Sequence, residues 1–194
     1  MSMYKDYTID FSSRCKKIID LYYKNSKEKE LDVSFLLMIA SSSFVIPFEK
    51  IRNDSNHIYD CNKGKKLKDS YFNKLALEKI ELKQLDTLET KPDSVSNSKR
   101  NIEDMETSLF LSIIRNAISH GNIQVIEQLS TKKIGKIAFI SEKFNSDKCS
   151  RCNQRIRTND KKIYNCLVFK ADEFKRFLDL WLNFLKDENE MEKK

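Results

Sequence analysis

The segment that most constrains the fold is residues 33–46, which are apolar on almost every side of a helix. Asp32 directly precedes this run as an expected helix N-cap, and Pro47 ends or kinks the helix after it. A helix without a polar face has to be surrounded by other elements. The run is too short for a bilayer and carries serines at positions 41–43. It therefore predicts the central helix of a bundle.

Other segments show the three- and four-residue spacing of apolar side chains that is typical of amphipathic helices. Such helices are expected over residues 10–24, from position 69 or 70 to about 88, from 102–106 to 120, and over 173–188. The 194 residues include only three glycines and two prolines, which disfavours a turn-rich all-β fold. Residues 1–194 should therefore form a single, mainly helical domain.

The sequence pattern changes after Gly121, where short runs become rich in β-branched and aromatic residues. Strands are expected over residues 123–126, 136–140 and 163–170, and the polar stretch 141–162 is a long hairpin loop. The expected fold class is mainly α, a helical bundle with a small β-hairpin before the C-terminal helix. Two polar segments complete this outline, a mobile linker over residues 89–100 and a frayed tail over residues 187–194.

Basic residues outnumber acidic ones, and the formal net charge is +7. The lysines are spread along the chain, so the surface should carry a broad positive potential that permits nucleic-acid binding without requiring it. No window approaches the ~18 apolar residues that mark a membrane span. The N-terminal residues lack the apolar core of a signal peptide. A cytoplasmic protein with no membrane partner is expected.

Chemically versatile side chains follow the apolar run 109–114, where a helix should end. Asn116 and His120 are four residues apart and share a helix face, and Gly121 is a natural left-handed cap. Arg115 can hold a phosphate with two parallel hydrogen bonds, and an imidazole exchanges protons near neutral pH. These residues are candidates for anion binding and proton transfer. The alternative is a surface ion pair at Arg115 and an ordinary helix-terminal histidine.

This arrangement resembles the signature of the HEPN superfamily, in which four to six residues separate an arginine from a histidine. Arg115, Asn116 and His120 fit that signature, including the polar residue that often follows the arginine. The order of helices, small hairpin and final helix resembles that of short, stand-alone bacterial HEPN proteins over most of the chain. Many HEPN proteins cleave RNA in toxin-antitoxin, phage-defence and CRISPR-linked systems.

The resemblance implies a metal-independent endoribonuclease in which the RNA 2′-hydroxyl attacks the neighbouring phosphate and leaves a 2′,3′-cyclic phosphate. The catalytic residues would then be His120 for proton transfer, Arg115 for stabilising the developing charge, and Asn116 for orientation. The reaction needs both an acid and a base, and one chain offers one such histidine, so a homodimer is expected. RNA is the expected partner rather than DNA, which lacks the 2′-hydroxyl. An antitoxin or another defence-system protein is a further expected partner.

Two other functions fit the same sequence. One is a catalytically silent HEPN module that binds RNA, a nucleotide or a partner protein, and the other is a purely structural helical adaptor. Basic residues beyond the motif are candidates for RNA contacts, namely Lys132, Lys133 and Lys136. The basic loop 63–68 could contribute as well, although all these lysines are equally compatible with a solvated surface.

Cys149 and Cys152 have the spacing of two zinc ligands in a tight turn. They form half of a tetrahedral site, which would need Cys166 and a fourth ligand such as Cys61 or His57. This structural zinc would lie apart from the proposed active site, for which no cofactor is expected. The alternative is that Cys149 and Cys152 are exposed reduced thiols and that Cys166 is a buried strand residue.

Overall fold

The computed structural model describes residues 7–25, 32–45, 64–98, 101–128, 133–142, 146–148, 155–157 and 162–191. Its helices are α1 (Tyr7–Asn25), α2 (Asp32–Ala40), α5 (Thr107–His120) and α6 (Ala171–Met191), and the π-helix η1 (Ser41–Val45) continues α2. These elements confirm the helices expected at both ends of the chain and before Gly121. None of the helices within the described residues is long and apolar enough to cross a membrane.

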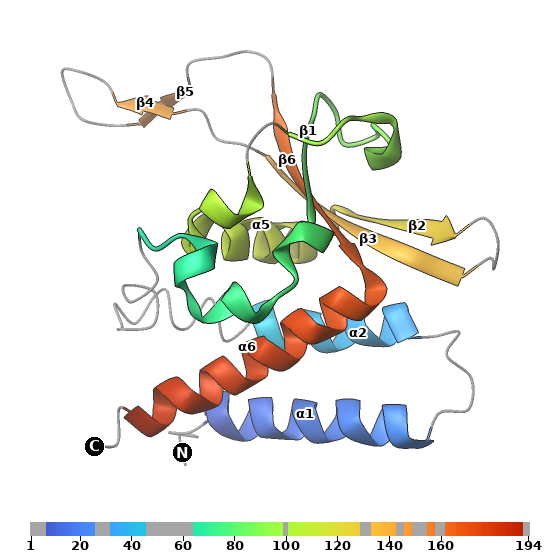
Figure 1. Cartoon of the computed structure of the whole chain (residues 1–194), viewed down its shortest axis with the longest axis vertical. Coiled ribbons are helices and arrows are strands. Elements are labelled where there is room, and N and C mark those ends of the chain that lie inside the picture. Colours follow the sequence, from blue (N-terminus) through green and yellow to red (C-terminus); the bar gives the residue numbers. More distant parts are fainter. Residues whose placement is uncertain are drawn as a thin grey trace.

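A four-stranded antiparallel sheet lies against the helices (Figure 1). Its strand order is β1-β6-β3-β2, formed by β1 (Glu81–Leu85), β6 (Tyr164–Lys170), β3 (Lys133–Glu142) and β2 (Ile123–Gln128). A separate hairpin, β4 (Ser146–Lys148) and β5 (Arg155–Arg157), lies within the predicted hairpin loop at the end of the molecule remote from α1. The predicted strands after Gly121 are confirmed as β2, β3 and β6.

The expected fold class, a mainly helical bundle with a small hairpin, is wrong because the sheet has a fourth strand, β1. The helix expected from position 69 or 70 to about 88 is replaced by the 3-10 turns Tyr71–Lys74 and Leu77–Lys79, followed by β1. The β1 sequence contains residues that favour helices in isolation. Pairing with β6 along its whole length determines its conformation instead.

The apolar segment that follows Asp32 forms a helix as predicted, but the helix is not enclosed on every side. Leu36 and Phe44 are buried, whereas Met38 is 61% exposed. The hydroxyls of the three consecutive serines, Ser41, Ser42 and Ser43, donate to the carbonyls four residues earlier. Such bonds satisfy the hydroxyls locally, so the serines need no partner on another element.

An aromatic cluster joins α6 to the rest of the core. Phe177 of α6 packs against Phe110 of α5 with ring centroids 5.8 Å apart, and against Phe169 of β6 at 6.1 Å. Trp181 packs against Phe44 of η1 at 4.6 Å. Its indole N–H donates to the Ser43 carbonyl over 2.9 Å, so the buried polar group is satisfied. This cluster therefore joins α5, α6, η1 and β6 in one core.

The opposite face of the sheet carries a second hydrophobic cluster, packed against Leu88 and Val95 from the segment after β1. Pro92, within the predicted linker, is buried, and its carbonyl accepts a 2.8 Å hydrogen bond from Lys83. The Lys83 ammonium also lies 2.9 Å from a Glu81 oxygen. These contacts hold part of the segment against the sheet. Its predicted mobility over residues 89–100 stays a prediction.

Removing the buried Lys83 ammonium should destabilise the fold more than removing its partly exposed neighbour Lys136. Burial raises the Glu81 pKa, but hydrogen bonds from Lys136 and Lys83 together leave it below its usual range. The Lys83 side chain is 5% exposed and that of Lys136 is 34% exposed. We expect Lys83→Met to lower the free energy of unfolding by about 2 kcal/mol, because the Pro92 carbonyl loses its donor. Lys136→Met should cost less than about 1 kcal/mol.

Urea denaturation of both variants at neutral pH measures this difference. Equal losses of unfolding free energy for the two substitutions would show that burial of the Lys83 ammonium does not increase its contribution to stability.

Candidate functional site

Helix α5 presents the motif because its apolar face is fixed by the core. Phe110, Ile114 and Ala117 are buried, which leaves the other side of the helix for polar residues. Gly121 ends the helix with a φ of 69°, and the N–H of Asn122 donates to the Ala117 carbonyl over 2.9 Å. The predicted left-handed cap is therefore confirmed. His120 is therefore the last residue of the helix.

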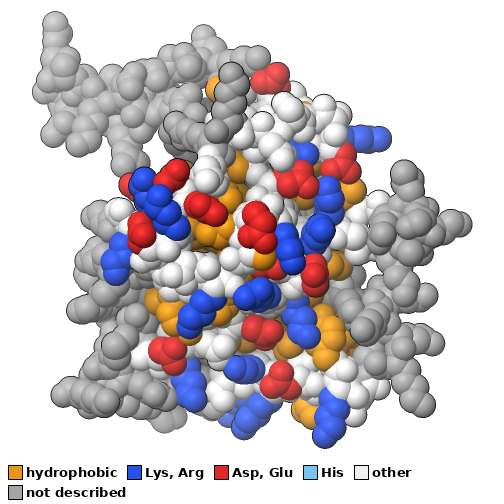
Figure 2. Space-filling view, in the orientation of Figure 1, with side chains coloured by type: hydrophobic (Ala, Val, Ile, Leu, Met, Phe, Trp, Pro, Cys, Tyr) orange, Lys and Arg blue, Asp and Glu red, His pale blue; other side chains and the backbone are white. Residues whose placement is uncertain are grey.

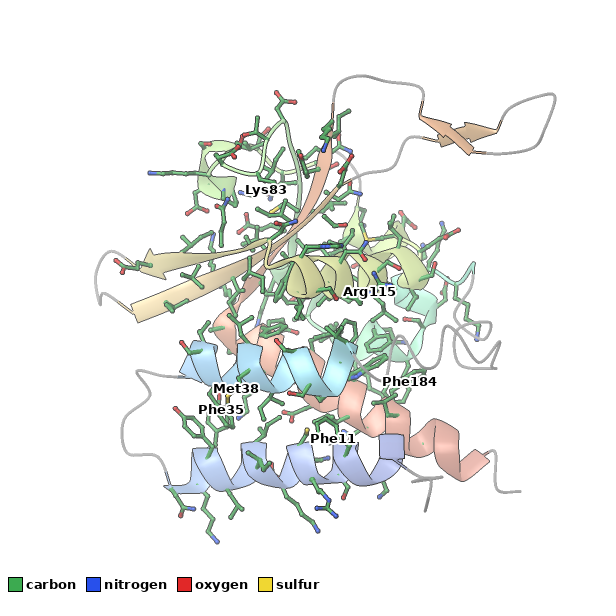
Figure 3. The ribbon with its side chains drawn as sticks, turned by 180° about the vertical axis from the view of Figure 1, so that it is seen from behind. Phe11, Phe35, Met38, Lys83, Arg115 and Phe184 are labelled. Atoms are coloured by element: carbon green, nitrogen blue, oxygen red, sulfur yellow. The ribbon has the colours of Figure 1, made fainter. Side chains whose placement is uncertain are left out.

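Arg115 and Asn116 form a hydrogen-bonded pair on α5. The Arg115 guanidinium donates through Nη1 to the Asn116 side-chain oxygen, and both side chains are half-buried. The Asn116 nitrogen donates to the Ser141 hydroxyl of β3 over 3.3 Å. Arg115 lies on α5 in the view from behind the molecule (Figure 3). The amide of Asn116 thus connects the guanidinium to the sheet.

His120 is exposed at the end of the same helix. It follows Asn116 by one helical turn, so the two side chains share a face. Its imidazole makes no hydrogen bond with any other described residue and is therefore accessible to a ligand. The three residues that the sequence singles out all lie in the C-terminal part of α5, where Arg115 and Asn116 are hydrogen-bonded to each other and the His120 imidazole is exposed.

Of the three lysines predicted to contact RNA, the structure describes the side chain of Lys136 alone, and it does not join this site. Lys136 points to the face of β3 opposite α5, where its ammonium lies 2.8 Å from Glu81 and 3.7 Å from Asp93. The backbone of Lys133 belongs to β3, but its side chain lies outside the described residues, as does all of Lys132. Among the described residues, Figure 2 shows basic and acidic side chains interspersed on the face turned toward the viewer, without a patch of one sign.

Cys166 is completely buried in β6. Burial raises the pKa of its thiol to about 12, which opposes formation of the thiolate that zinc requires. Cys149, Cys152, Cys61 and His57 lie outside the described residues. Within the described part of the chain, no three His, Cys, Asp or Glu side chains are grouped as a metal site would need. The structural zinc stays a prediction.

Sequence reasoning did not identify Ser141 as part of this site, because it placed the residue at the start of the hairpin loop. The alternation of buried side chains along β3 is the signal that could have identified Ser141. Ile137 and Phe139 belong to the main core on the helix side of the sheet, so Ser141, two residues later, points to the same side. A hydroxyl at that position lies next to α5.

The family described as HEPN pEK499 p136 matches residues 1–192. No curated protein and no solved structure matches the chain. The matched region includes α5 with Arg115, Asn116 and His120, and it extends over almost the whole length of the sequence. The chain therefore belongs to the HEPN family.

Proposed function

We propose that the protein is a metal-independent endoribonuclease that acts as a homodimer in the cytoplasm, as part of a toxin-antitoxin or phage-defence system. One observation carries this proposal: Asn116 joins Arg115 to the sheet, and His120 is exposed at the end of the same helix. The family membership supports it, since many HEPN proteins are ribonucleases.

The proposed reaction needs only side-chain chemistry. One His120 imidazole removes the proton of the RNA 2′-hydroxyl, whose oxygen forms a bond to the neighbouring phosphorus. The bond from phosphorus to the 5′-oxygen breaks, and a second imidazole, in its protonated form, gives that oxygen a proton. Arg115 stabilises the charge that accumulates on the phosphoryl oxygens during the transfer. The products carry a 2′,3′-cyclic phosphate and a 5′-hydroxyl.

The need for two imidazoles is the reason for proposing a two-fold dimer. Each chain supplies one His120, and a symmetric interface between two α5 ends would place both imidazoles and both guanidiniums in one cleft. Exposure of His120 in the single chain is compatible with such an interface. A partner protein of the same system would then control access to the cleft.

The test is cleavage of a defined RNA by purified protein in the presence of EDTA. We expect cleavage that persists with the chelator and yields a 2′,3′-cyclic phosphate end. A matched oligonucleotide with 2′-deoxyribose at the cleaved position should stay intact. Cleavage of that control, or cleavage that stops with EDTA, would exclude the mechanism. Binding of RNA without cleavage would favour the silent HEPN module instead.

A further inference from the structure

The contact between Asn116 and Ser141 joins the motif to a residue that lies outside it. Ser141 is 4% exposed and sits near the end of β3, on the side of the sheet that faces the helices. Its partner in the β3–β6 register is Asn165, which is also a buried polar residue. The helix side of the sheet is therefore apolar at Phe139 and becomes polar at Ser141. Asn116 contacts the sheet at this polar position, through its hydrogen bond to Ser141.

An asparagine amide has two chemically different ends, and only the oxygen suits the Arg115 guanidinium, which can donate but not accept. The oxygen can accept a hydrogen bond from the Arg115 guanidinium, whereas the nitrogen, which is itself a donor, would oppose it. Ser141 offers a hydroxyl oxygen to the nitrogen over 3.3 Å. By accepting from the nitrogen, the Ser141 hydroxyl ties that end of the amide to β3 while the oxygen faces Arg115.

We propose that Ser141 is a positioning residue for the ribonuclease reaction. It anchors the Asn116 amide against β3, and through that amide it helps to hold the Arg115 guanidinium in place. This inference rests on the proposed function, since the guanidinium has to meet the phosphoryl group in the transition state. A guanidinium held by a hydrogen-bonded neighbour loses less conformational freedom when it binds the phosphate.

The first test compares Ser141→Ala with the control Ser70→Ala. Ser70 is 6% exposed, and its hydroxyl also makes buried hydrogen bonds, donating to the Leu67 carbonyl and accepting from the Phe72 amide. Both variants lose a buried hydroxyl. We expect Ser141→Ala to lower kcat by about tenfold with KM changed less than about twofold, because the guanidinium is misplaced only slightly. The kcat of Ser70→Ala should stay at the wild-type value.

A double-mutant cycle separates positioning from general stability. If Ser141 acts through Asn116, the loss of kcat caused by Ser141→Ala should disappear in the Asn116→Ala background. An equal loss in both backgrounds would overturn the proposal. So would a fall in kcat for Ser70→Ala as large as the fall for Ser141→Ala.

A second measurement does not depend on activity. In ¹⁵N-labelled full-length protein, the side-chain amide signals of Asn116 should shift and exchange faster with water in Ser141→Ala, but not in Ser70→Ala. Unchanged Asn116 signals in Ser141→Ala would overturn the positioning role even if the protein cleaves RNA. Failure of the wild-type protein to cleave RNA would instead count against the proposed function and leave the NMR result interpretable.

Discussion

Replacing His120 with alanine is expected to lower the rate of RNA cleavage by about 10² to 10⁴-fold, the usual contribution of a positioned general acid or base. The imidazole is exposed at the helix end, so its removal leaves no cavity and the melting temperature should stay close to that of the wild type. His57→Ala is the matched control, because His57 is the only other histidine in the chain. Cleavage should be measured in EDTA under single-turnover conditions. Wild-type activity in the His120 variant would exclude the proposed mechanism.

The same variant tests whether two chains share one site. When wild-type and His120→Ala chains are co-expressed with different tags, random pairing produces mixed dimers. If the reaction needs an imidazole from each chain, mixed dimers are inactive and total activity follows the square of the wild-type fraction. A linear dependence on that fraction would mean that each chain works alone, and the two-fold composite site would then be wrong.

The motif was predictable from the sequence because its geometry is local. The four-residue spacing of Asn116 and His120 and the left-handed cap at Gly121 depend on one helix and its end. The role of Ser141 was not predictable, because its contact with Asn116 joins residues 25 positions apart and depends on how α5 packs against the sheet. The local motif thus indicates the chemistry, whereas the supporting contact depends on tertiary structure.

The sheet shows even more clearly that contacts between distant segments cannot be predicted from local sequence. The β1 residues favour a helix by their local preferences, and their strand conformation comes from pairing with β6, as between Leu82 and Leu167. Lys136 is a second example, because its positive charge makes it a candidate for contacting RNA in the sequence. Its place on the face of β3 opposite α5 follows from the β3 register, which the sequence does not specify until the partner strands are known.

The largest expected loss of stability comes from Trp181→Ala, which should lower the free energy of unfolding by about 3 to 5 kcal/mol. Trp181 is 1% exposed and packs against Phe44 and Phe72, with ring centroids 4.6 Å and 6.4 Å away. A loss of this size is a large part of the ~5 to 15 kcal/mol that stabilises a typical domain. Because the aromatic cluster also holds α5 against α6 and the sheet, the motif should lose its support as the protein unfolds.

Trp181→Phe separates packing of the ring from the hydrogen bond of the indole. Phenylalanine keeps most ring contacts but leaves the buried Ser43 carbonyl without its 2.9 Å donor, and we expect a cost of about 1 to 3 kcal/mol. Met38→Ala serves as the control, since its exposed side chain should contribute within about 0.5 kcal/mol. Urea denaturation should be followed by circular dichroism, because Trp181 is the only tryptophan. Equal costs for the two Trp181 substitutions would show that the indole hydrogen bond, rather than ring packing, joins α6 to η1.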